Sequence, residues 1–156
     1  MANTQAISAS FLSEMLVGNH QLGSVTLTSR TSLTAPTTDT IKAALYLASA
    51  TINKSTTAYT ATGEVANSGT YAAGGATVTN ATAPTNDGTT AYWTPSAAIS
   101  WTGVTATSFD TVLFYNSTQS NKAIANYNFG SQTVVSGNIT LNMPTNNGTT
   151  GLLRFA

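Results

Sequence analysis

The chain has 156 residues, of which only 6% are charged, with five Lys and Arg balanced by five Asp and Glu. A soluble domain usually carries about 25% charged residues. A formal net charge of zero supplies no long-range field that would attract nucleic acid, an anionic membrane or an acidic substrate, so none of these is expected as a partner. The absence of cysteine excludes disulfides, thiolate chemistry and Cys-ligated zinc.

The composition favours a single folded domain rich in β-structure. Hydrophobic residues make up 41% of the chain, with five Phe, six Tyr and two Trp, which is more than a disordered segment usually holds. Thr, Val and aromatic residues favour pleated sheet, whereas Asn, Gly and Ser favour turns. Apolar runs are only a few residues long and the N-terminus lacks the pattern of a signal peptide, so we expect a soluble chain without a leader.

Residues 4–17 are the one segment with a helical pattern. Ile7, Phe11 and Met15 recur at four-residue spacing and would form one apolar stripe. We therefore predict an N-terminal helical arm over residues 1–22. This short helix either covers the chain's own sheet or docks on another subunit.

Apolar and polar residues alternate in several segments between residues 23 and 144, which predicts a series of strands. The predicted strands lie around residues 25–27, 41–48, 71–82, 90–94, 107–129 (a hairpin) and 139–143. Gly74 and Gly75 indicate a bulge or a close backbone approach, and Asn86-Asp87-Gly88 is typical of a turn. The first hairpin strand carries large apolar groups on both faces, as a strand inside a sandwich would. We predict an all-β fold, an antiparallel β-sandwich over residues 23–144 with the short N-terminal helix.

Two apolar segments lie outside the alternating strand pattern. One is the helix stripe, and the other is the C-terminal tail, residues 145–156, in which apolar side chains follow an Asn-Asn-Gly turn. Apolar residues in such positions need a surface to cover, so we predict that they contact a neighbouring subunit or a partner protein. The predicted contact residues are Ile7, Phe11, Met15, Leu152, Leu153 and Phe155.

Residues that could carry catalysis are few and scattered. His20 is the one imidazole, and no nucleophile motif accompanies it, so we interpret it as a loop or capping residue. A carboxylate pair for glycoside hydrolysis would need two acids to converge, and only Glu64 and Asp110 lie within apparent strand segments. No spacing typical of metal or phosphate binding occurs. We therefore expect no enzymatic activity, no cofactor and no metal.

Five aromatic residues admit two interpretations. They are Tyr59, Tyr71, Tyr92, Trp93 and Trp101. Exposed together, they would line a sugar-binding surface, and buried, they would pack in the core or in an interface. Packing is the interpretation that the composition favours.

Several short motifs follow one another along the chain. They are SFLSEMLVGNH, IKAALYLASATIN, TTAYTATGEV, TYAAGGATV, DGTTAYW and VLFYNSTQSNKAIANYNFG. Their order over about residues 10–144 resembles that of a family of small virion proteins of tailed bacteriophages. The Ser- and Thr-rich stretch 24–40 is longer than the family's usual link, and the tail continues past the usual Pro-terminated end. The resemblance implies a structural protein of the head surface or the tail, and it carries over no catalytic residue.

The low charge suits a protein that must stay bound through changes in salt. Apolar and neutral hydrogen-bonding contacts are less sensitive to salt than ion pairs. We therefore predict a capsid decoration (cement) protein, a homotrimer on the capsid surface of the virion, which is assembled in the cytoplasm of the bacterial host. Its expected partners are the major capsid protein and further copies of itself. The alternative is a tail or head-fibre adhesin that recognises host surface glycans through exposed aromatic residues.

Overall fold

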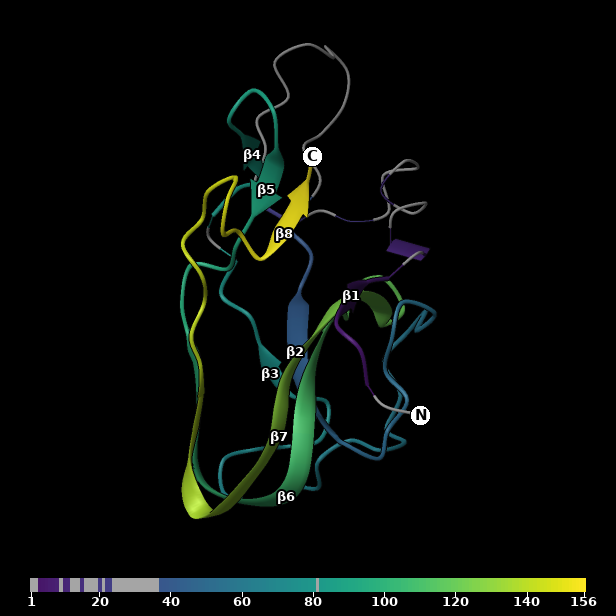
Figure 1. Cartoon of the computed structure of the whole chain (residues 1–156), viewed down its shortest axis with the longest axis vertical. Helices are drawn as coiled ribbons and strands as arrows, with labels where there is room; N and C mark the ends of the chain where they lie inside the picture. Colours follow the sequence, from purple (N-terminus) through teal and green to yellow (C-terminus); the bar gives the residue numbers. More distant parts are fainter. Residues whose placement is uncertain are drawn as a thin grey trace.

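The structure is a computed structural model that describes residues 3–8, 10, 11, 15, 20, 22, 23, 37–80 and 82–156. Its strands form two antiparallel sheets, which confirms the all-β prediction (Figure 1). The five-stranded sheet has the order β1 (Ala6–Ile7), β7 (Lys122–Leu141), β6 (Ile99–Asn116), β2 (Ile41–Leu47) and β3 (Ala76–Thr77). The smaller sheet has the order β4 (Thr85–Asn86), β5 (Ala91–Trp93) and β8 (Leu153–Phe155).

A long hairpin of β6 and β7 forms the centre of the molecule. Its turn lies at residues 117–121, where the sequence predicts it, and its far end pairs Ile99 with Leu141. Several shifts of register interrupt the ladder, and such bulges bend a strand. Residues with positive φ occur along both strands, at Gly103, Ser108, Gly130 and Ser136. The hairpin accordingly curves over at the end remote from its turn (Figure 1).

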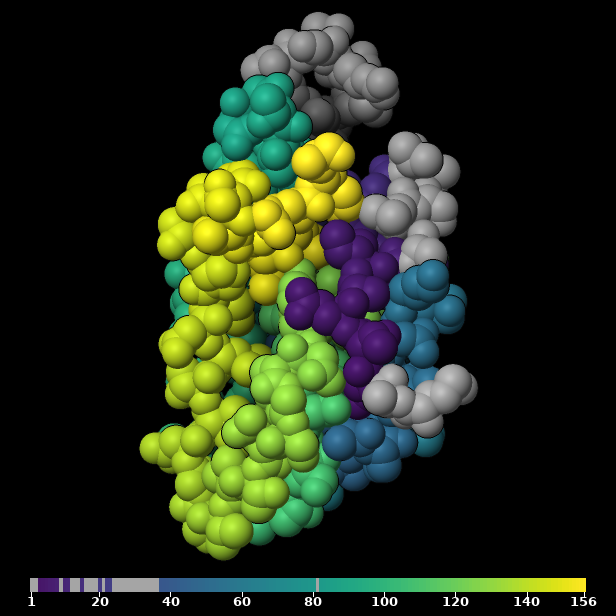
Figure 2. Space-filling view, viewed as in Figure 1, coloured from purple at the N-terminus to yellow at the C-terminus, as the bar shows by residue number. Residues whose placement is uncertain are grey.

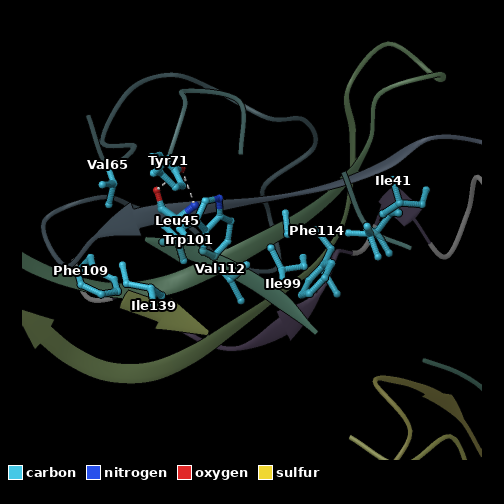
Figure 3. Packing of buried hydrophobic residues seen from close by; sticks show 14 of the residues in the cluster. Ile41, Leu45, Val65, Tyr71, Ile99, Trp101, Phe109, Val112, Phe114 and Ile139 are labelled. Atoms are coloured by element: carbon cyan, nitrogen blue, oxygen red, sulfur yellow. Dashed lines mark hydrogen bonds between the residues drawn. The ribbon is translucent and has the colours of Figure 1, made fainter. Parts of the chain in front are cut away.

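The bend divides the hairpin into two parts that pack on each other. We call residues 109–128 the inner half, and residues 99–108 with 129–141 the outer half. Side chains of both halves belong to one buried cluster, in which Trp101 and Ile139 of the outer half lie with Val112 of the inner half (Figure 3). Full burial of one large apolar side chain stabilises a fold by about 1.5–3 kcal/mol, so this contact holds the bent hairpin closed.

The inner half is covered on both faces, as predicted from its apolar pattern. Ala43 and Leu45 of β2 point into the large cluster, whereas Ala44 and Tyr46 point into a second cluster on the opposite face. This alternation follows from the two-residue period of a strand. The loop after β2 closes the second face, where Tyr59 stacks on Tyr115 of β6 with ring centroids 4.8 Å apart.

The predicted N-terminal helix is wrong at its start, because Ala6–Ile7 is strand β1. These residues pair with Asn126 and Ala125 of β7, and the amide of Asn126 donates a hydrogen bond to the carbonyl of Thr4. A short helix gains little by itself, whereas the edge of β7 offers backbone partners that periodicity alone does not reveal. Of the predicted helix beyond β1, the structure describes Ser8, Ser10, Phe11 and Met15, and the other residues lie outside the described ones, as does the predicted strand at 25–27.

Two other predicted elements change identity in the structure. Residues 139–143 do not form a separate strand. Strand β7 continues to Leu141 through positions that, in the sequence alone, look like the end of a strand. The C-terminal tail, which was predicted to lie outside the strands, contains strand β8. This strand pairs with β5, with Leu153 opposite Trp93. The close approach predicted at Gly75 is confirmed, since a Cβ added there would lie 1.9 Å from the carbonyl oxygen of Ala43.

Candidate interaction surface

The carboxylate of Glu64 organises a loop instead of facing a substrate. It accepts hydrogen bonds from the hydroxyl groups of Tyr59 (2.6 Å) and Tyr71 (2.8 Å) and from the backbone N–H of Gly74 (2.7 Å). Burial raises the pKa of the Tyr71 phenol above its usual value, and the neighbouring Glu64 charge raises it further. Three donors on one carboxylate tie together residues 59–74 of the loop that covers the inner half of the hairpin.

Asp110 fixes the N-terminal segment in the same way. Its Oδ1 accepts hydrogen bonds from the amide of Asn3 (2.7 Å) and from the hydroxyl of Thr111 (2.8 Å). The carbonyl oxygen of the Asn3 side chain in turn accepts a hydrogen bond from the backbone N–H of Ile52 (2.9 Å). Glu64 and Asp110 therefore belong to different hydrogen-bond clusters, and neither cluster has the arrangement of a glycosidase pair.

Asp39 and His20 meet at the end of β6. The amide nitrogen of Asn116 lies 2.6 Å from Asp39 Oδ2 and 3.0 Å from His20 Nδ1, and all three residues are buried. The imidazole also packs edge-on against the ring of Phe11, at 4.8 Å between centroids. An amide and an aromatic ring are the neighbours of a structural histidine, in line with its interpretation as a loop residue.

Asp87 caps its own turn. Its Oδ1 accepts hydrogen bonds from the backbone of Thr89 (3.0 Å) and Thr90 (2.8 Å) and from the Thr89 hydroxyl (2.9 Å). The backbone N–H groups of Thr90 and then Thr89 lower the pKa of this carboxyl. Each acid within the described part of the chain thus accepts hydrogen bonds from its own polypeptide.

The aromatic residues do not form a sugar-binding platform. Tyr71, Trp93 and Trp101 are 2–3% exposed, and Tyr59 and Tyr92 are half-buried. The indole N–H of Trp93 donates to a backbone carbonyl, and Tyr71 packs edge-on against Trp101 at 5.4 Å. This burial agrees with the packing interpretation of Tyr71, Trp93 and Trp101.

An apolar groove of about 830 Å³ opens on the surface of the described residues. It lies between the N-terminal segment, the outer half of the hairpin and the C-terminal tail, and is visible as the hollow between purple and yellow-green atoms in Figure 2. We call it the edge groove. Its lining includes the apolar residues Ile7, Phe109, Val112, Phe114, Tyr127, Phe129, Val134, Ile139, Leu141, Met143 and Leu152.

The edge groove lies against a sheet face at the inner half of the hairpin and reaches a strand edge at the outer half. Residues 138–144 line it without a gap, and so do residues 5–7. Successive side chains of a strand point to opposite faces, so a hollow that touches every residue of β7 from 138 to 141 reaches around the strand edge there. The groove therefore exposes backbone of β1 and β7 as well as apolar side chains.

The structure separates the six predicted contact residues into three pairs. Ile7 and Leu152 line the edge groove, which brings the N-terminal and C-terminal segments to one site. Phe11 and Leu153, by contrast, are 0% and 1% exposed and belong to the chain's own core.

The remaining two predicted contacts lie elsewhere. Met15 is 40% exposed, and Phe155 is half-buried with its ring 6.4 Å from that of Phe11. The strand edge at 138–141 was missed, because alternation in a sequence identifies faces and not edges.

No group of three or more metal-binding side chains occurs among the described residues. In the same part of the chain, no helix has the length and apolarity to cross a bilayer. The comparisons with known proteins add no relative. No family model matches the chain, and no curated protein or solved structure is similar to it.

Proposed function

We propose that this chain is a structural protein of a tailed-bacteriophage virion, a decoration (cement) protein that binds the head surface and stabilises neighbouring capsid subunits. The observation that carries this proposal is the edge groove, an open apolar site in a chain with almost no surface charge. The order of sequence motifs, which resembles that of small virion proteins, supports the same assignment.

The placement of the acidic residues fits a protein that must stay bound to the virion through dilution and changes in salt. Asp39, Glu64, Asp87 and Asp110 accept hydrogen bonds inside the chain, which leaves attachment mainly to apolar and neutral polar contacts. Such contacts are weakly screened by salt. The proposed partners are the major capsid protein and other copies of this chain, arranged as a homotrimer.

The proposed finer architecture is an antiparallel β-sandwich with a short N-terminal helix. The bent hairpin supports the sandwich, because its two halves enclose one apolar cluster. The helix would follow β1 and place Phe11 in that cluster. Backbone chemical shifts of the free protein test both features, and a purely extended N-terminal segment would exclude the helix.

The experiment that tests the function is reconstitution on phage heads that lack this protein. We expect saturable binding at hundreds of copies per particle, retained at about 1 M salt, where the Debye length is about 3 Å. A few tens of copies per virion or fewer, on the tail or in head fibres, would favour the adhesin instead. No association of the wild-type chain with virions would overturn the proposal.

A further inference from the structure

Strand β7 lines the edge groove, and one edge of this strand is largely unpaired among the described residues. Strand β7 pairs with β6 along one edge, and on its other edge the described residues provide only the short β1, opposite Ala125 and Asn126. An edge of this kind is a template for another strand. Residues 127–141 contain neither a proline nor a charged side chain, two of the features that usually block such pairing.

The walls of the groove suit the side chains of an added strand. Phe109, Val112 and Phe114 of β6 line it from the inner cluster, and Ile139 and Leu141 line it from the outer half. An extended segment presents every second side chain to the same face, so apolar residues at alternate positions would enter the groove together. Its remaining side chains would point to solvent.

Among the described residues that line the edge groove, Arg154 is the single charged one. Its guanidinium donates a hydrogen bond to the carbonyl of Thr149, and no acidic side chain lines the groove with it. An Arg retains further donors after one such bond, and a carboxylate is their natural partner. A second copy of this chain offers few carboxylates for this role, because among its described acids Asp39 and Asp110 are buried and Glu64 already accepts three hydrogen bonds, which leaves Asp87 exposed.

We infer that the edge groove receives an extended segment of the protein on which this chain is mounted, and that the segment adds as a β-strand to the free edge of β7. Its apolar side chains occupy the groove at alternate positions, and one Asp or Glu meets Arg154. The inference rests on the proposed function, in which the mounting protein is the major capsid protein. It adds the mode of attachment and the chemistry of the bound segment.

Adjacent valines of β7 provide a matched test. Val134 lines the groove, whereas Val135 is 72% exposed and lies outside it. We expect Val134→Asp to weaken binding to heads that lack this protein by about tenfold or more, because its carboxylate would be desolvated against an apolar segment. Val135→Asp should bind within about twofold of wild type, since it adds the same charge outside the groove. Thermal unfolding of both variants shows whether each retains its fold.

A charge pair gives a second test that does not touch the core. Arg154→Glu and Lys54→Glu make the same change at two exposed positions, and only Arg154 lines the groove. We expect Arg154→Glu to weaken head binding by about fivefold or more and Lys54→Glu to leave it within about twofold.

A photo-crosslinker identifies the occupant of the groove. It is placed at Asn138, an exposed residue of the groove, with position 135 as the control. We expect crosslinks from 138, but not from 135, to one extended segment of the capsid protein. Crosslinks from 138 to another copy of this chain would overturn the inference, as would unimpaired head binding by folded Val134→Asp and Arg154→Glu. Those results leave the proposed function standing, whereas no binding by the wild-type chain would overturn that function itself.

Discussion

The two halves of the long hairpin differ in how they are covered. In the inner half, every residue of β6 from Phe109 to Asn116 is buried. In the outer half, buried Ile99, Trp101 and Val104 are separated by exposed residues. Strand β6 is therefore fully buried at one end and partly exposed at the other. The comparison indicates that the inner half supplies stability and that the outer half is available for contacts.

The largest expected difference between the halves is the cost of truncating an apolar side chain. Leu113 of the inner half is 0% exposed, and we expect Leu113→Ala to lower the free energy of unfolding by about 2–5 kcal/mol. Val135 of the outer half is 72% exposed, so Val135→Ala should cost less than about 0.5 kcal/mol. Urea unfolding measures both, and equal losses would contradict the division.

Two glycines sharpen the same comparison. Gly75 and Gly130 both have positive φ, which costs an alanine about 1–2 kcal/mol. A Cβ at Gly75 would also lie 1.9 Å from the carbonyl of Ala43, whereas nothing lies within 4 Å at Gly130. Gly75→Ala should therefore destabilise the chain more than Gly130→Ala in the same unfolding experiment. A larger loss at Gly130 would show that the bend, and not the inner half, controls stability.

The loop that covers the inner half depends on the Glu64 carboxylate. Glu64→Gln keeps the size of the side chain but turns one of its two acceptor oxygens into an NH₂ donor facing Tyr59, Tyr71 and Gly74. We expect a loss of about 1–3 kcal/mol in the free energy of unfolding. Thr62→Ala, at an exposed position of the same loop, is the control and should be nearly neutral. An unchanged stability of Glu64→Gln would mean that packing alone holds the loop.

Alkaline pH probes the contact between the two halves. Tyr71 packs on Trp101 of the outer half and donates a hydrogen bond to Glu64, and burial raises its pKa above the usual 10.0. The folded chain keeps this proton where the unfolded chain loses it, so stability is full below about pH 10 and falls as the pH rises further. Urea midpoints between about pH 8 and pH 11 should follow this decline. The decline should be shallower in Tyr71→Phe, and an equal slope would assign it to other tyrosines.

The sequence predicted the inner half well because its evidence is local. Alternating apolar residues in 41–48 and 107–115 correspond to β2 and the buried part of β6. The outer half was predicted incompletely, because glycines and serines at its bulges resemble loop residues until the partner strand is known. Strand β1 was missed for a related reason, since Ala6–Ile7 gains its conformation from the edge of β7 and not from its own pattern.

Of the residues that line the candidate site, the sequence analysis named only two, one near each end of the chain. Ile7 and Leu152 were expected to make contacts, and both line the edge groove. Phe11 and Leu153 were selected by the same reasoning and are core residues, because an apolar stripe in a sequence does not show which side it faces. The groove itself depends on how the hairpin bends, and that bend follows from tertiary packing.

Hydrogen exchange in the free and the head-bound protein compares the two halves most directly. We expect amides of residues 109–116 to exchange slowly in both states, because they lie in a buried strand. Amides of residues 130–141 should exchange faster in the free protein and become protected on binding, as a new strand pairs with the edge of β7. Unchanged exchange of 130–141 in the bound protein would contradict the assignment of the outer half as the contact surface.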